Sequence, residues 1–151
     1  MHFLGKILLV ENNVSICSVY ASILKDEGYF LKYTNTGKGA MELLENNAFD
    51  IAICDFYLPD INGISLAKKI KERDENIYSI LFTAASSDKI EIEALASGIN
   101  DFILKPCGDG RLLLGIQRGI EIRKDRIYRK LIGNKVTELS HLVEEYGYGG
   151  K

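Results

Sequence analysis

Short apolar runs alternate with stretches of helical periodicity along most of this chain. Five runs have the length and the β-branched content of strands, and they lie at residues 7–10, 29–33, 51–54, 77–82 and 101–104. Between them, apolar residues recur every three or four positions, which predicts helices over residues 14–24, 36–46, 64–73 and 90–96. Strands that alternate with helices imply right-handed crossovers, so we expect one parallel sheet with helices on both faces.

The pattern also predicts a longer fifth helix over residues 111–132. We expect its first half to cover the sheet and Gly133-Asn134 to break or kink it, before a second apolar stripe that starts at Val136. Residues 146–151, rich in glycine and tyrosine, are expected to be frayed and disordered. The chain is therefore predicted to contain a domain over residues 1–124 and a helical extension or linker over residues 125–151.

The predicted extension allows two interpretations. Its apolar stripe could pack on its own domain as part of a solvated helix. Alternatively, it could pair with the same helix of a second chain and pass a signal onward. A completed domain of five helices leaves little room for another apolar stripe, which favours the pairing.

Composition narrows the class of protein. The 151 residues are enough for about one domain, and a formal net charge of -2 gives no general attraction to nucleic acid or to anionic membranes. Three cysteines without metal-binding spacing indicate small buried side chains in a reducing compartment. We find no signal peptide and no run approaching the roughly 18 uncharged apolar residues that cross a bilayer. The sequence therefore predicts a cytoplasmic protein without membrane insertion.

Polar side chains follow four of the predicted strands at their carboxyl ends: Glu11 and Asn12, then Asp55, Thr83 and Lys105. Since parallel strands point the same way, these side chains should gather at one edge of the sheet. Two carboxylates and an amide suit Mg²⁺, while a lysine supplies a fixed cation and a threonine donates a hydrogen bond. A carboxylate in these surroundings is a competent nucleophile toward a phosphoryl group, which predicts an aspartyl phosphate on Asp55.

These residues resemble the receiver domain of the bacterial two-component response regulator family over residues 5–124. The matching motifs are Leu8-Leu9-Val10-Glu11-Asn12, then Asp55 with Leu58-Pro59 and Gly63, then Phe82-Thr83-Ala84, and Phe102-Ile103-Leu104-Lys105-Pro106. The resemblance implies a flavodoxin-like, doubly wound α/β sheet of order 2-1-3-4-5, with Asp55 as the phosphoacceptor.

The same resemblance implies roles for further residues. Tyr57 would offer its main-chain carbonyl to the metal, Thr83, the Ala84 backbone and Lys105 would contact phosphate, and Thr83 and Phe102 would form the pair of switch residues. A small side chain at Ala84 leaves the phosphate room to enter. The Lys105-Pro106 bond would be cis.

The first predicted strand ends in a way that departs from the family pattern. The family usually has two acids there, and the second of them contacts the metal, whereas this chain has Asn12. An amide oxygen still coordinates Mg²⁺ but removes one negative charge, so we expect weaker Mg²⁺ affinity, with Glu11 acting as an outer ligand through water. Either Asn12 or Asn13 could also cap the first helix.

The resulting hypothesis is a phosphorylation-controlled signalling module. Asp55 would take a phosphoryl group, with Mg²⁺, from a sensor histidine kinase or a phosphotransfer protein. The phosphoryl group would then reshape the face made by the fourth helix, the fifth strand and the fifth helix, a face through which, like the C-terminal helix, a homodimer could form. The chain would assist only its own phosphorylation and hydrolysis, so it is not expected to be a conventional enzyme, and it could be part of a longer regulator or hybrid sensor kinase.

Two other hypotheses compete with this one. A receiver-like interaction module that works without phosphorylation is supported only by Asn12, and the intact Asp55, Thr83 and Lys105 oppose it. A phosphatase of the aspartate-nucleophile class would need a second aspartate two positions after the nucleophile. Tyr57 occupies that position, so we disfavour the phosphatase.

Overall fold

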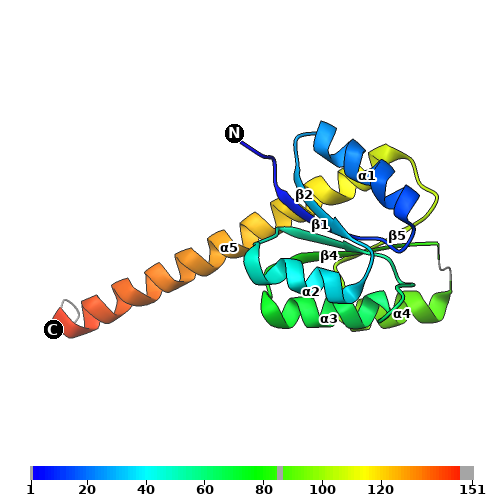
Figure 1. Ribbon diagram of the computed structural model, residues 1–151. Coiled ribbons are helices and arrows are strands. Elements are labelled where there is room, and N and C mark those ends of the chain that lie inside the picture. The colour runs from blue at the N-terminus through cyan, green and yellow to red at the C-terminus, as the bar shows by residue number, and fades with distance from the viewer. Residues whose placement is uncertain (1, 85–86, 147–151) are drawn as a thin grey trace.

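One parallel sheet forms the centre of the molecule (Figure 1). The structure is a computed structural model that describes residues 2–84 and 87–146. The strand order is β2-β1-β3-β4-β5, which confirms the predicted flavodoxin-like topology. Its strands are β1 Lys6–Val10, β2 Phe30–Thr34, β3 Ile51–Cys54, β4 Tyr78–Thr83 and β5 Asp101–Leu104. The helices are α1 Val14–Asp26, α2 Gly37–Asn46, α3 Gly63–Arg73, α4 Asp88–Ala96 and α5 Asp109–Tyr146.

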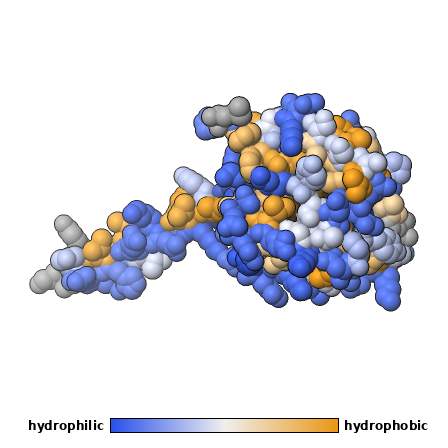
Figure 2. Space-filling model, viewed as in Figure 1, coloured by the Kyte–Doolittle hydropathy of each residue, from blue (hydrophilic) through white to orange (hydrophobic). Residues whose placement is uncertain are grey.

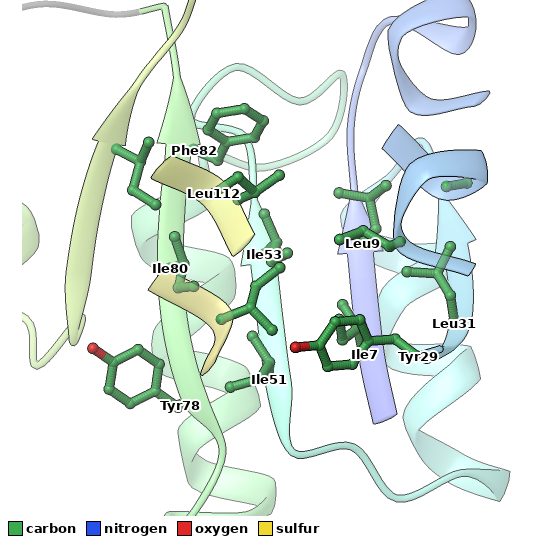
Figure 3. Packing of buried hydrophobic residues seen from close by; sticks show 14 of the residues in the cluster. Ile7, Leu9, Tyr29, Leu31, Ile51, Ile53, Tyr78, Ile80, Phe82 and Leu112 are labelled. Atoms are coloured by element: carbon green, nitrogen blue, oxygen red, sulfur yellow. The ribbon is translucent and has the colours of Figure 1, made fainter. Parts of the chain in front are cut away.

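Helices cover both faces of this sheet, which explains why its central strands β3 and β4 are buried at every position. On one face, Ile7 and Leu9 of β1 pack in a cluster with α1 and with Leu112 of α5. Figure 3 shows Leu112 lying over this face close to Ile53 and Phe82. On the other face, Leu8 and Val10 join a cluster with α2 and α3, and a third cluster joins α3 to α4. The alternation of side chains along β1 thus divides its residues between the two layers.

Several helices begin at a polar side chain that accepts a hydrogen bond from the first turn. Asn13 Oδ1 accepts from the Ile16 N–H at 2.9 Å, and Asn62 Oδ1 accepts from the Ser65 N–H at 2.9 Å. Of the two asparagines that could cap α1, the structure therefore selects Asn13. This leaves Asn12 at the strand end without a capping role.

Helix α5 runs without interruption from Asp109 to Tyr146, so the predicted break at Gly133-Asn134 is wrong. A glycine inside a helix costs only about 1 kcal/mol relative to alanine, and no proline follows to block the next turn. Thr137 Oγ1 also donates a hydrogen bond to the Gly133 carbonyl at 3.0 Å, inside the helix. The expected fraying after residue 146 falls outside the described residues.

Only the first part of α5 packs on the sheet. Leu112, Ile116 and Ile120 are buried there, and Arg123 then forms an ion pair with Asp50 at 2.8 Å. Beyond this point the helix projects away from the sheet layers (Figure 1), and every residue from 131 to 146 is exposed. The predicted boundary after residue 124 stays a prediction, although α5 leaves the core near it.

The composition of the chain led to expectations about the cysteines and about membrane-spanning segments, and the structure describes both features. Cys17 and Cys54 are buried and Cys107 is half-buried, and all three thiols are free. Burial raises the pKa of the Cys54 thiol to about 12, which keeps that side chain protonated and chemically inert. Within residues 2–84 and 87–146, the helices are too short or too polar to span a bilayer.

Candidate phosphoacceptor site

Backbone hydrogen bonds extend the sheet by one residue beyond two of its strands. The Asp55 N–H donates to the Val10 carbonyl at 2.9 Å, and the Lys105 N–H donates to the Thr83 carbonyl at 2.9 Å. Asp55 is thereby held beside the end of β1, and Lys105 beside the end of β4. The polar residues that follow separate strands in the sequence therefore lie at one edge of the sheet, as parallel strands require.

Lys105 lies between two carboxylates at this edge. Its ammonium forms an ion pair with Glu11, and its Nζ atom lies 3.6 Å from Asp55 Oδ2. The three side chains are 12%, 3% and 12% exposed for Lys105, Glu11 and Asp55, so water screens their charges only weakly. The structure thus brings together three residues that are far apart in the sequence.

The ammonium of Lys105 lies over one aromatic ring, and a second aromatic ring packs against the first. Its Nζ atom lies 5.0 Å from the centroid of the Phe82 ring, at a distance typical of a cation–π contact. Tyr20 of α1 meets Phe82 edge to face, with centroids 5.0 Å apart and ring planes at 80°. Sequence reasoning placed Phe82 in the motif Phe82-Thr83-Ala84 but gave neither ring a role at the site. The available signal was that Phe82 directly precedes Thr83 at the end of β4.

The environment of Glu11 favours a bound cation. Burial, and next the adjacent Asp55 carboxyl, raise the pKa of Glu11 above its usual range, while Lys105 and the Asn13 N–H act in the opposite direction. That N–H donates to Glu11 Oε2 at 3.1 Å. Two carboxylates held this close repel each other, and a single lysine offsets only one of their charges.

The oxygen donors at this edge suit a hard divalent cation. Among the residues that the structure describes, no three His, Cys, Asp or Glu side chains gather as a metal site. A metal here would therefore need neutral oxygens besides Glu11 and Asp55, and these could come from Asn12 and from the main chain at Tyr57. Both of those residues are exposed. Such an all-oxygen set that leaves room for water fits Mg²⁺ and not Zn²⁺.

The loop after Asp55 is tightly constrained. A Cβ atom on Gly63 would lie 2.1 Å from the Asp55 carbonyl oxygen, so no larger residue fits while the loop keeps its shape. The Gly63 N–H also donates to the Phe56 carbonyl at 2.8 Å, and a short antiparallel bridge joins Tyr57 to Asn62. These contacts fold the loop back onto the backbone of Asp55 and fix its position.

Asp60 in the same loop has a role that the sequence did not reveal. Its two carboxylate oxygens accept hydrogen bonds from the Gly37 and Lys38 N–H groups of α2, at 2.9 and 2.8 Å. These bonds lower the pKa of Asp60, because they stabilise the charged carboxylate. The loop that carries the candidate acceptor is therefore tied to the N-terminus of a neighbouring helix.

The remaining predicted site residues lie on β4 and β5. Thr83 is fully buried at the end of β4, and Ala84, which follows it, is exposed. Phe102 of β5 is half-buried against the cluster that joins α3 and α4, two rungs along the ladder from the pair Thr83 and Leu104. The Lys105-Pro106 bond is cis, as the resemblance implied.

Comparisons with known proteins agree on one kind of domain. The family model described as a response regulator receiver domain matches residues 7–117. The transcriptional regulatory protein ZraR of Klebsiella oxytoca is 32% identical over 114 residues, which cover 76% of this chain and 26% of that protein. The chain thus spans about a quarter of the length of this curated relative.

Solved structures show the same similarity. A CheY-like response regulator receiver domain protein from Methanospirillum hungatei JF-1 superposes with a TM-score of 0.78 at 27% identity, over 82% of this chain and 98% of that chain. The signal receiver domain of an HD domain-containing protein from Pseudomonas fluorescens Pf-5 gives a TM-score of 0.79 at 25% identity, over 85% and 96% of the two chains. Both comparisons cover nearly all of the solved domain.

Proposed function

Because this chain belongs to the response regulator receiver domain family, we propose that it is the phosphoacceptor module of a two-component phosphorelay, with Asp55 as the acceptor. The observation that carries this proposal is the position of Asp55 beside Lys105 and Glu11 at the carboxyl edge of the sheet. In this surrounding a carboxylate nucleophile has a cation at hand for the charge of an incoming phosphoryl group.

The proposed reaction is a phosphoryl transfer from a phosphohistidine. A carboxylate oxygen of Asp55 bonds to phosphorus while the phosphorus–nitrogen bond of the donor breaks, and the departing imidazole takes a proton from water. Lys105 lies close enough to interact with the charge on the transferred oxygens. Glu11, Asn12, Asp55 and the Tyr57 carbonyl would hold Mg²⁺, which would supply further charge neutralisation in the transition state.

The signal would leave the site through Thr83 and Phe102. The Thr83 hydroxyl and the Ala84 N–H would contact the phosphoryl group, and Phe102 would move inward as Thr83 shifts. This movement would reshape the face made by α4, β5 and α5. Phosphorylation would then act by population shift, since only the active conformation supplies these contacts.

A sensor histidine kinase or a phosphotransfer protein would supply the phosphoryl group, as for the receiver family in general. The chain would assist its own phosphorylation and hydrolysis without being a conventional enzyme, and we propose that it works in the cytoplasm. ZraR of Klebsiella oxytoca is named a transcriptional regulatory protein. If a longer protein carrying this chain also controls transcription, its DNA contacts would be made elsewhere, since this chain has a net charge of -2.

A second candidate function is an interaction module that works without phosphorylation. The neutral Asn12 at the strand end favours it, because the metal site has one charge fewer than a site with two acids. The two functions differ in whether Asp55 responds to a phosphoryl mimic.

The test uses beryllofluoride, which mimics an acyl phosphate on a carboxylate. Added with Mg²⁺, it should perturb the NMR signals of Thr83 and Phe102 in the wild type and leave Asp55→Asn unchanged. Asp50→Asn is the matched control, since Asp50 precedes β3 as Asp55 follows it, and this variant should respond like the wild type. An unresponsive wild type would favour the interaction module.

In a separate titration Asn12→Asp should bind Mg²⁺ more tightly than the wild type, and equal affinities would contradict the assigned role of Asn12.

A further inference from the structure

The projecting part of α5 carries an exposed apolar seam. We define this seam as Ile132, Val136, Leu139, Val143 and Tyr146, which are 44%, 55%, 59%, 49% and 71% exposed. Figure 2 shows hydrophobic surface along this part of the molecule, away from the sheet layers. Leu142, also exposed, widens the seam on one side. An exposed apolar strip of this length on a projecting helix indicates a surface that binds another molecule.

The seam has the spacing of a coiled coil. Its members are separated by four, three, four and three residues, so Val136 and Val143 fall at the a positions of a heptad. Ile132, Leu139 and Tyr146 fall at the d positions. Val136 and Val143 at the a positions and Leu139 at the central d position match the β-branched a residues and leucine d residues of two-stranded coiled coils, while Ile132 and Tyr146 occupy the outer d positions. The choice of residues thus favours a coiled coil of two helices.

The seam begins only where α5 has left the domain. One heptad earlier, the a and d positions hold Arg129 and Asp125, which form an ion pair with each other at 3.0 Å. Lys130, next to them, forms an ion pair with Glu75, which lies in the turn that follows α3. Charged residues therefore occupy the heptad positions just before the seam, where α5 still contacts its own domain. The seam starts after them at Ile132, where α5 is free of the domain.

From these observations we infer that the seam pairs with the same seam of a second copy of this chain, as a short parallel coiled coil. Parallel pairing places each seam residue against its own copy and brings both domains to one end. Two alternatives fit less well. The seam projects away from its own domain, and residues 132–146 carry Glu138, Glu144 and Glu145 against the single Lys135, which opposes binding to an anionic membrane surface.

The proposed interface is small, so we expect the association to be weak. A seam of 15 residues spans about 21 Å at the usual rise of a helix, and interfaces of specific stable complexes bury roughly 1,200–2,000 Å² in total. Five side chains per copy supply less than this, so association should depend on concentration. This inference does not depend on phosphoryl transfer to Asp55.

Mass measurement on the full chain tests the pairing. Sedimentation should show a mass that rises with concentration for the wild type, and Leu139→Asp should abolish this rise. Thr137→Asp is the matched control, because Thr137 lies on the same exposed helix but outside the seam, and it should associate like the wild type. A wild type that stays monomeric, or equal effects of the two variants, would overturn the inference, as would binding to anionic vesicles in place of self-association.

Cysteine cross-linking tests the direction. Tyr146→Cys and Ile132→Cys should each form disulfide-linked dimers under mild oxidation, because parallel pairing brings the same residue of both copies together. Thr137→Cys and the wild type should give only background, which accounts for the native Cys107. If only Leu139→Cys near the centre of the seam cross-links, the helices are antiparallel and the proposed arrangement is wrong.

Discussion

Lys105 forms an ion pair with Glu11, although the two residues are 94 positions apart in the sequence. The same ammonium nitrogen lies 3.6 Å from Asp55 Oδ2. One cation therefore serves two carboxylates before any phosphoryl group arrives. Its removal should affect the stability of the fold as well as the chemistry of the site.

Lys105→Met should destabilise the protein by about 3 kcal/mol at neutral pH, since it leaves the buried Glu11 carboxylate without its cation. Burial already raises the pKa of Glu11, so the folded state gains stability when this group is protonated. The loss in the variant should accordingly shrink as the pH falls toward 4.5, the ordinary pKa of a glutamate. Urea unfolding at several pH values measures this.

Lys130→Met is the control for that experiment. It removes the ion pair with Glu75, in which both side chains are largely exposed, and such pairs contribute little. Equal losses of stability in the two variants would show that the buried position of Lys105 at the sheet edge does not increase the contribution of its ion pair.

Gly63→Ala should weaken both the fold and the response to beryllofluoride. The added Cβ would meet the Asp55 carbonyl oxygen at 2.1 Å, so the loop must move and carry Asp55 with it. We expect a loss of about 2 kcal/mol, in the range for overpacking. Gly133→Ala in α5 adds a methyl group with no heavy atom within 4 Å and should instead stabilise the protein slightly. Thermal unfolding of the two variants gives opposite shifts if this is correct.

Asp60→Ala should cost about 1 kcal/mol at neutral pH, because Asp60 accepts two hydrogen bonds from the first turn of α2. Since its pKa is lowered in the folded state, this contribution is present above the ordinary value of 3.8 and is lost as the pH falls through the lower, folded value. The difference from the wild type should therefore narrow below pH 3.8. Glu45→Ala, at the exposed opposite end of α2, should change little at any pH.

Phe82→Leu should weaken beryllofluoride binding several-fold, because it removes the ring beneath the Lys105 ammonium and the contact with Tyr20. The smaller side chain also costs stability, so Phe49→Leu is needed for comparison. Phe49 is as deeply buried but lies in the cluster on the opposite face of the sheet. A similar loss of binding in both variants would mean that the ring acts only through packing.

Periodicity was enough to predict the sheet, because the central strands β3 and β4 are buried on both faces and the helices between the strands are buried on one side. The position of Asp55, Glu11 and Lys105 at one edge followed from the parallel direction of the strands alone. Helix α5 was harder, since Gly133 carries a stop signal that the rest of the helix outweighs.

Contacts between distant segments could not be predicted from local patterns. Asp60 reaches α2 across 23 residues of sequence, and nothing near it marks its carboxylate as a cap. The ring of Phe82 looks like any core residue in a strand, and only the fold places the Lys105 ammonium over it. Such residues are set by tertiary geometry, which a single sequence does not encode locally.

The uninterrupted course of α5 makes it a lever as well as a cover for the sheet. Lys130 still forms an ion pair with Glu75 of the domain, so the free arm runs from Ile132 to Tyr146 and is about 21 Å long at the usual helical rise. A tilt of about 5° at the base of this arm displaces the tip by about 2 Å, for an arm of that length. A small rearrangement at the carboxyl end of β5 that tilts α5 would thereby be enlarged at the tip of the helix.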